Sequence, residues 1–343
     1  MDLPLAASFA GAVQSSAGKR PQAIAHRGYK AAYPENTMGA FIGAIEIGKF
    51  FPVRTDHMAK RNADRYTQEP MRLRLTSTSL RDPDLKRCFG KDDKIIDCDW
   101  EYIKTLQTLK EPHQPMPRLK DLLTYLAKPG LENVWVLLDI KISPPSTVLQ
   151  RKRINWEEHD NHAENVFRCM AAALEEVKSS RPWNERVLLG CWAARYLPLC
   201  TKYLPGYPIT HIGFNISYAR QFLKVPGIGF NMLQMIMVGP RGSALLRDIK
   251  AAKRSILLWT VNEERWMKWS IRKEVDGVIT DDPKKYLEVC DSYQGDDIHV
   301  PVSTWARIVW LNMMAAGFSF LFRLRFGWKI KDESAGSKVR VPV

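Results

Sequence analysis

The chain carries polar residues of the kinds that cut a phosphodiester. Such a reaction must neutralise the phosphate charge, protonate the leaving oxygen and deprotonate a nucleophile. An imidazole can move the proton, cationic side chains can hold the phosphate, and carboxylates can bind a hard divalent cation. Residues of these three kinds occur at His26, Arg27, Glu35, Asp139 and Lys141. Their types suit phosphoryl chemistry where they converge on one site.

Apart from Glu35, which lies in the loop after Arg27, these residues lie at or just after short apolar runs of the sequence. His26 and Arg27 follow Ala23–Ala25, Asp139 and Lys141 end Val134–Ile140, Trp259 and Asn262 end Ser255–Val261, and Asp281 and Asp282 follow Gly277–Thr280. In a barrel of parallel strands, the carboxyl ends of the strands share one mouth. We therefore expect the candidate residues to surround that mouth.

Each candidate residue also has an ordinary structural explanation. A histidine at a strand end is often structural, Glu35 would be favoured by the dipole of a following helix, and Asp139 with Lys141 would make a surface ion pair. Only their convergence on one mouth favours catalysis.

The elements that must position these residues alternate between strand and helix. The predicted strands are Ala23–Ala25, Val134–Ile140, Arg186–Trp192, Ile209–Ile216, Phe230–Val238, Ser255–Val261 and Gly277–Thr280, with a doubtful eighth at Met71–Leu80. The predicted helices are Thr37–Ile47, Trp100–Leu109, Leu119–Leu126, Ala163–Val177, Ala244–Lys253 and Pro283–Cys290. Continuous apolar strands followed by helices indicate a buried parallel sheet. The fold class is therefore α/β, a TIM-type (β/α)8 barrel that is incomplete or distorted at strands 2 and 3.

Composition divides the 343 residues into a barrel with two tails. We expect a flexible tail over 1–20, the barrel over 21–290 and a polar linker over 291–303. An apolar helix over 304–327 and a basic tail over 328–343 would follow. The N-terminus lacks a basic segment, so no secretory signal is expected.

The apolar segment near the C-terminus predicts membrane association. Its uncharged run, Ile308–Phe322, has fifteen residues, or roughly 22 Å of helix, against a hydrocarbon core of ~30 Å. Trp305 and Trp310 suit a membrane interface. The alternative is a helix packed on the barrel, which an apolar composition on every face disfavours.

The net charge of +14 indicates an anionic partner. The charge suits either nucleic acid or an acidic membrane surface of anionic glycerophospholipid, and does not by itself choose between them. No nucleic-acid-binding fold is evident, so nucleic acid is not expected. The six cysteines include no C-x-x-C pair, which predicts reduced, mostly buried thiols. His159 and His162 have the spacing of a metal pair, but a solvated helix start is the preferred interpretation.

Four segments together resemble the motifs of glycerophosphodiester phosphodiesterases. Ile24–Phe41 is similar to the H-R-G…P-E-N-T…A-F signature of that family, and Leu137–Lys141 to its carboxylate-x-lysine strand. Leu258–Asn262 and Asp276–Pro283 resemble its last two motifs. The likeness covers Pro21 to Cys290, and its spacing is most similar to the phosphatidylglycerol phospholipase C branch.

The resemblance implies roles for the candidate residues. His26 would be one of two acid–base histidines, with Arg27 and Lys141 on the phosphate. Glu35 and Asp139 would bind Ca²⁺ or Mg²⁺. The implied substrate-binding residues are Asn36, Trp259 and Asn262.

The implied activity is metal-dependent hydrolysis of phosphatidylglycerol or glycerophosphodiesters in lipid metabolism. It would take place at an intracellular membrane, with the catalytic domain facing the cytosol. The alternative is an inactive, membrane-bound, lipid-binding relative.

Two strands that the resemblance requires are missing from the sequence. After the first helix the family has G-A-x-x-I-E-x-D-V, with two metal-binding acids, and then a strand ending in His-Asp. A basic segment, residues 49–81, occupies that place. It is expected to be irregular up to Leu80.

One explanation of the basic segment is a retained intron over residues 49–68. Codons for Gly48-Lys49-Phe50 can contain a splice donor, and codons for Tyr66-Thr67-Gln68 can end in an acceptor. A frame shift over the following eleven residues can then encode Gly-Ala-His-Ala-Ile-Glu-Thr-Asp-Val-His-Leu, which fits the missing strand. The alternative is a natural insertion in a divergent relative.

Overall fold

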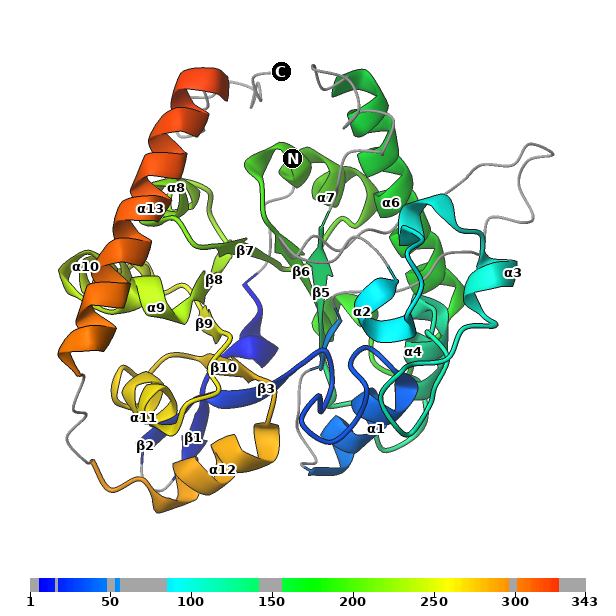
Figure 1. The fold of residues 1–343 in the computed structure, drawn as a ribbon, viewed down its shortest axis with the longest axis horizontal. Helices are drawn as coiled ribbons and strands as arrows, with labels where there is room; N and C mark the ends of the chain where they lie inside the picture. The colour runs from blue at the N-terminus through cyan, green and yellow to red at the C-terminus, as the bar shows by residue number, and fades with distance from the viewer. Residues whose placement is uncertain are drawn as a thin grey trace. The chain divides into compact units, whose positions relative to one another are not determined.

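The structure is a computed structural model that describes residues 6–15, 18–47, 53–55, 85–141, 156–295 and 301–326. Eight strands follow one another in the cyclic order of a TIM-type barrel, β10-β3-β4-β5-β6-β7-β8-β9, and β1 and β2 form a separate two-stranded sheet (Figure 1). The predicted fold class is confirmed. By its internal contacts the chain divides into two compact units, each described below by itself.

The first unit comprises Met1–Ile24, Gly190–Arg195 and Pro208–Val343. Its strands are β1 (Val13–Ser15), β2 (Gly18–Arg20), the start of β3 (Gln22–His26), the end of β6 (Val187–Cys191), β7 (Ile209–Gly213), β8 (Gly229–Leu233), β9 (Ile256–Trp259) and β10 (Gly277–Thr280). Its helices are η1 (Ser8–Ala10), the start of η4 (Ala194–Tyr196), α8 (Ile216–Phe222), α9 (Gln234–Met237), α10 (Pro240–Ala251), α11 (Glu264–Arg272), α12 (Pro283–Ser292) and α13 (Val302–Phe326). Strands β7 to β10 pair in parallel, and most of their residues are buried.

The second unit comprises Ala25–Leu189 and Tyr196–Tyr207. It holds the end of β3, β4 (Val53–Thr55), β5 (Val136–Ile140) and most of β6. Its helices are α1 (Met38–Ile47), α2 (Lys86–Phe89), η2 (Ile95–Asp97), α3 (Trp100–Ile103), α4 (Leu119–Leu126), α6 (Trp156–Glu176), η3 (Trp183–Glu185) and α7 (Leu197–Tyr203). Every residue of β5 is buried, as the apolar run predicted.

In the second unit, the register of the parallel strands shows which candidate residues lie at the same level of the sheet. Strand β4 pairs in parallel with β3 through His26 and Arg54. The same Arg54 pairs with Leu137 of β5. His26 is therefore level with Leu137, two residues before Asp139 along parallel strands. With neighbouring strands ~4.8 Å apart, the backbones of β3 and β5 lie roughly 10 Å apart at this level.

Several elements differ from their sequence-based prediction. The apolar runs Ile209–Ile216 and Phe230–Val238 each begin as a strand and then turn into helices α8 and α9. The helix predicted from Trp100 to Leu109 ends at Ile103, and Leu109 is exposed. The eighth strand is β4, inside the segment expected to be irregular, so that expectation is wrong for Val53–Thr55. The doubtful strand Met71–Leu80 lies outside the described residues.

The N-terminal segment was predicted to be a flexible tail, and the structure gives it defined elements instead. It forms η1 and the β1–β2 hairpin. The side chain of Gln22 donates to the carbonyl oxygens of Phe9 and Gly11, and the backbone N–H of Ala12 donates to Asp276. Side-chain and backbone bonds of this kind order the segment within the first unit.

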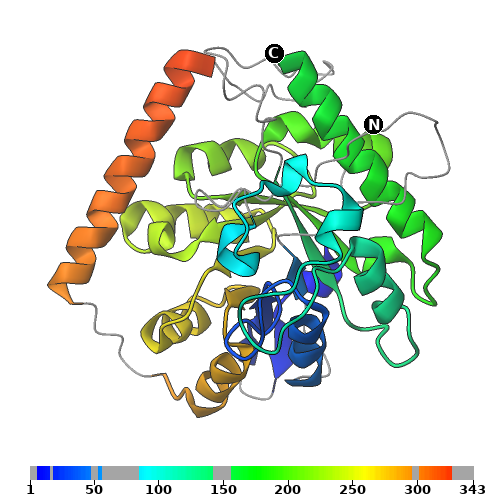
Figure 2. The same cartoon turned by 45° about the vertical axis from the view of Figure 1, so that its right-hand side comes forward.

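A helix, α13, covers the region 304–327 in which an apolar helix was predicted. It runs past α9 (Figure 2) and buries Ile308. Several large apolar side chains of its first turns are exposed: Val302, Trp305, Val309, Trp310, Met313 and Met314. Within the described ranges, no helix has both the length and the apolarity to cross a bilayer. Residues 296–300 of the linker and the whole basic tail lie outside the described residues.

The six cysteines are free thiols. Cys191, Cys200 and Cys290 are buried and the other three are half-buried, so the prediction of mostly buried thiols holds for three of the six. His162 is 7% exposed in α6, so the solvated helix start preferred from the sequence is wrong for this residue. The side chain of His159 lies outside what the structure describes.

Candidate active site

The turn that follows β3 positions His26 and Arg27. Arg27 has φ 62° and Gly28 has φ 80°, both in the left-handed region. A Cβ on Gly28 would lie 2.6 Å from the carbonyl carbon of Ala40 in α1, so only glycine fits there. The Tyr29 N–H donates to the Ala40 carbonyl at 2.8 Å. This close approach fixes the strand end against the helix.

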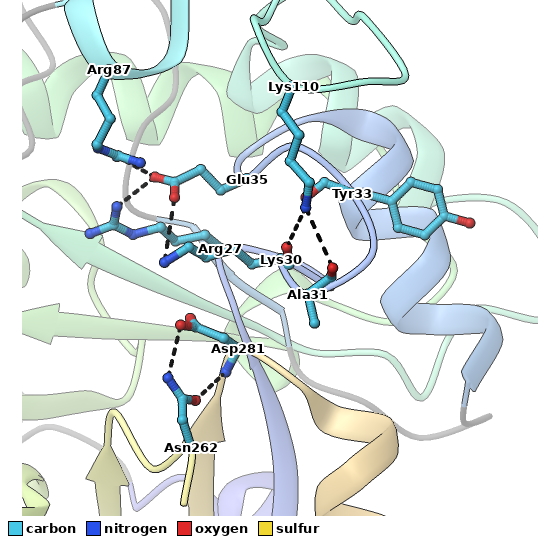
Figure 3. A network of polar contacts seen from close by, with 9 residues as sticks. All are labelled: Arg27, Lys30, Ala31, Tyr33, Glu35, Arg87, Lys110, Asn262 and Asp281. Atoms are coloured by element: carbon cyan, nitrogen blue, oxygen red, sulfur yellow. Dashed lines mark hydrogen bonds and ion pairs between the residues drawn. The ribbon is translucent and has the colours of Figure 1, made fainter.

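The loop from Arg27 to Asn36 is closed by its own backbone and by one lysine. The Asn36 N–H donates to the Arg27 carbonyl at 2.9 Å, and Asn36 itself has φ 57°. Lys110 donates from Nζ to the carbonyl oxygens of Lys30, Ala31 and Tyr33 at 2.9, 3.4 and 3.1 Å (Figure 3). These hydrogen bonds hold the loop in a defined conformation. Asn36, which was predicted to bind substrate, is only 5% exposed.

Glu35 is the centre of a cluster of cationic side chains (Figure 3). Its Oε1 accepts from Arg27 Nη1 at 2.6 Å and from Arg87 Nη2 at 2.5 Å. Lys30 Nζ lies 3.6 Å from Oε2. Three positive side chains thus meet one carboxylate, whose side chain is only 5% exposed.

Burial and the guanidinium groups act in opposite directions on the Glu35 carboxyl. Burial, the larger single effect, raises its pKa, but the hydrogen bonds and charges of Arg87 and Arg27 together lower it well below the ordinary value. Glu35 is therefore ionised throughout the neutral range.

Asp139 and Lys141 form a second charged pair at the end of β5. Lys141 Nζ lies 3.1 Å from Asp139 Oδ2, and the side chains are 5% and 0% exposed. The surface ion pair considered from the sequence is therefore a buried pair. Strand register brings this pair to the same edge as His26, which is 9% exposed.

The described residues do not fit a divalent cation. Such a cation takes six or more oxygen ligands, yet no group of three or more candidate ligand side chains occurs in the described part of the chain. Glu35 Oε1 already accepts from two guanidinium groups, and Asp139 pairs with Lys141. The two carboxylates predicted to bind metal are both neutralised by cationic side chains.

Two predicted substrate-binding residues, Trp259 and Asn262, belong to the first unit. Asn262 Oδ1 accepts from the Asp281 N–H at 2.9 Å and from Thr280 Oγ1 at 3.1 Å, and its Nδ2 donates to Asp281 Oδ2 at 2.9 Å (Figure 3). The amide of Asn262 thus fixes the carboxyl end of β10. Trp259 Nε1 donates to the Asn231 carbonyl at 3.0 Å.

Trp259 is part of an aromatic cluster that sequence reasoning missed. Its ring lies 5.5 Å from that of Trp192, which lies 6.5 Å from Phe214. Trp192 and Phe214 directly follow β6 and β7, and Phe214 is exposed. The signal available in the sequence was an aromatic residue immediately after each of two apolar runs.

Arg87 and Lys110 were also missed as parts of the site. Arg87 lies in α2 and Lys110 in an irregular segment, far in sequence from the Arg27–Asn36 loop. No periodic pattern of the sequence links them to that loop.

Comparison with known proteins identifies a family to which the sequence is similar. The Glycerophosphoryl diester phosphodiesterase family matches residues 80–285. A curated relative, "Probable glycerophosphodiester phosphodiesterase 2" of Mycobacterium tuberculosis, is 26% identical over 262 residues, covering 76% of this chain and 86% of the relative.

Solved structures share the fold at low identity. A phosphodiesterase of Oleispira antarctica in complex with the product sn-glycerol-3-phosphate has a TM-score of 0.57 and 18% identity, covering 79% of this chain and 97% of its own. A glycerophosphodiester phosphodiesterase of Agrobacterium tumefaciens has a TM-score of 0.55 and 14% identity, covering 79% and 100%. With its family match extending over more than half of its length, the chain belongs to the glycerophosphoryl diester phosphodiesterase family and is a phosphodiester hydrolase by family.

Proposed function

We propose that this protein binds and slowly hydrolyses phosphatidylglycerol or a related glycerophosphodiester. One observation carries the proposal: the strand register places His26 and Arg27, at the end of β3, on the same edge as Asp139 and Lys141, at the end of β5. This edge combines a group that moves protons with cations that hold phosphate.

The retained residues divide the work as follows. Arg27 and Lys141 hold the phosphoryl oxygens, and their carboxylate partners keep both cations oriented. The hydroxyl next to the headgroup ester attacks phosphorus, and His26 accepts its proton. The bond from phosphorus to the other glycerol oxygen breaks, and that oxygen takes up the proton. Water then opens the cyclic phosphate.

Two features of the first unit favour a lipid over a water-soluble diester. The Trp192–Trp259–Phe214 cluster offers partly exposed aromatic surface within that unit, and such surface suits contact with a lipid. Helix α13 exposes the apolar side chains named above. An exposed apolar helix face with tryptophans suits the membrane interface, so we place the protein at an anionic membrane surface.

Turnover is expected to be slow because the catalytic set is incomplete. The described residues do not provide the ligands for a divalent cation, and the second acid–base histidine of the family motif is absent from the sequence. The family match begins at residue 80, where the basic segment ends. That boundary supports the retained-intron explanation for residues 49–68.

The test is hydrolysis by two forms of the protein. The natural chain is compared with a repaired chain. The repaired chain carries Gly-Ala-His-Ala-Ile-Glu-Thr-Asp-Val-His-Leu in place of the basic segment, and it also carries a restored strand ending in His-Asp. Release of glycerol phosphate and of diacylglycerol from phosphatidylglycerol vesicles is followed with Ca²⁺, Mg²⁺ or chelator. The repaired chain should show metal-dependent hydrolysis far above the natural chain. Equal, robust activity in the natural chain would refute the incomplete site.

A further inference from the structure

We infer that Arg87 replaces a divalent cation beside Glu35 and, with Arg27, forms an anion site for the substrate's phosphoryl group that needs no metal. The inference rests on the proposed function for the identity of the anion. It assigns a binding residue from α2, an element that none of the family-like motifs includes.

Arg87 occupies a carboxylate oxygen of Glu35 that a bound cation would otherwise use. A metal ion held by Glu35 would approach a carboxylate oxygen, and Arg87 Nη2 lies 2.5 Å from that oxygen. Arg27 Nη1 lies 2.6 Å from the same atom. Two guanidinium groups on one oxygen leave little room for a metal ion and would repel it.

The charged side chains around Glu35 differ in their exposure to solvent. The Arg27 and Glu35 side chains are 10% and 5% exposed, whereas those of Arg87 and Lys30 are 41% and 35% exposed. An anion arriving from solvent therefore meets Arg87 and Lys30 before the buried Arg27. Guanidinium groups are well suited to phosphate because their planar fork matches two oxygens.

Glu35 then has an orienting role. Its ionised carboxylate fixes the relative position of Arg27 and Arg87, two cations that would otherwise repel each other. This preorganises the pair before the anion binds, which lowers the cost of binding.

Calorimetric titration of the full-length protein with inorganic phosphate tests the inference. The wild type should bind phosphate equally in chelator and in excess Ca²⁺. Arg87→Gln should weaken binding by about tenfold to a hundredfold, the loss expected for one charge-assisted hydrogen bond. Lys86→Gln is the matched control: Lys86 is the preceding residue of α2, 70% exposed and paired with Asp92. It should bind like the wild type.

Arg87→Lys keeps the charge without the fork and should bind with intermediate affinity. Thermal unfolding of each variant separates lost binding from lost folding. Phosphate binding that vanishes in chelator and returns with Ca²⁺ would overturn the inference. So would equal affinities for the Arg87→Gln and Lys86→Gln variants, or no phosphate binding by the folded wild type.

The inference and the proposed function fail in different ways. If Arg87→Gln binds phosphate normally while a His26 variant of the repaired chain loses turnover, the inference is wrong and the function stands. If phosphate binding depends on Arg87 but even the repaired chain cuts no glycerophosphodiester, the function is wrong and the anion site stands.

Discussion

Lys141 Nζ lies 3.1 Å from the Oδ2 atom of Asp139, in a pair almost fully withdrawn from water. Asp139 lies near the end of β5 and Lys141 directly follows that strand, which pairs in parallel with β4. A buried pair gains from mutual attraction what it loses in hydration, so neither charge is tolerated alone. The pair therefore serves the fold as well as the proposed phosphate site.

Removing either charge of this pair should destabilise the folded protein. We expect Asp139→Asn and Lys141→Met each to lower the free energy of unfolding by about 3–5 kcal/mol. The double variant should lose less than the sum of the two single losses, because no lone charge remains. Urea unfolding followed by circular dichroism measures all three. Single losses below about 1 kcal/mol would show that the pair is hydrated in solution.

His26 should be essential for turnover but not for folding. In the repaired chain, His26→Gln should lower kcat by about 10²–10⁴-fold, the usual contribution of general acid–base catalysis. Its melting temperature should stay close to that of the repaired chain. Full activity after this substitution would assign the proton transfer to another residue.

Helix α13 should hold the protein on anionic vesicles. A chain ending at Asp297 should move from the vesicle pellet to the supernatant in flotation or sedimentation assays. In the full chain, serine at both Trp310 and Met313, which are exposed, should weaken vesicle binding. Ala306→Ser on the same helix is the control. A truncated chain that still pellets at high salt would place the membrane contact elsewhere.

Acid should destabilise the first unit through His211. This imidazole is 1% exposed, stacks on Phe222 at 3.9 Å, and approaches the Cys191 carbonyl with Nδ1 at 3.3 Å. Burial lowers its pKa to about 3, against a smaller opposite effect of the Cys191 carbonyl. Below about pH 6.5 the His211 side chain therefore binds a proton in the unfolded chain but stays neutral in the folded chain.

The resulting loss should grow as pH falls from 6.5 towards 3. At pH 5 the linkage amounts to about 2 kcal/mol relative to neutral pH. His211→Phe should remove this part of the acid sensitivity, whereas His113→Gln, at an exposed position, should not. Urea unfolding of the variants at pH 7 and pH 5 gives the comparison. Parallel pH dependence in the wild type and His211→Phe would contradict the assignment.

The barrel was predictable because continuous apolar runs mark buried parallel strands. The same signal failed at Ile216 and Gln234, where the runs continued into helices, because apolar composition alone does not separate a short buried helix from a strand. It also missed Val53–Thr55, a three-residue strand inside a basic segment. Such a strand is defined by pairing with its neighbours rather than by its own pattern.

The site was predictable only where its residues lie next to strands. His26, Arg27, Asp139 and Lys141 each follow or end an apolar run, so sequence alone placed them at one barrel edge. Arg87 reaches Glu35 across 52 residues of sequence, and no local rule predicts such a contact. The pairing of Glu35 with the two guanidinium groups was therefore not predicted, and its assignment as a metal ligand stays a prediction.

The backbone of Arg27 has an evolutionary consequence. A non-glycine residue at φ 62° costs of order 1 kcal/mol, and its charge then requires a buried partner at position 35. Folding by itself gives no reason to keep either residue. Laboratory evolution under heat challenge alone should therefore drift towards glycine or asparagine at position 27 together with an uncharged side chain at position 35. Lineages that must also retain ligand recognition should keep the arginine and its acid.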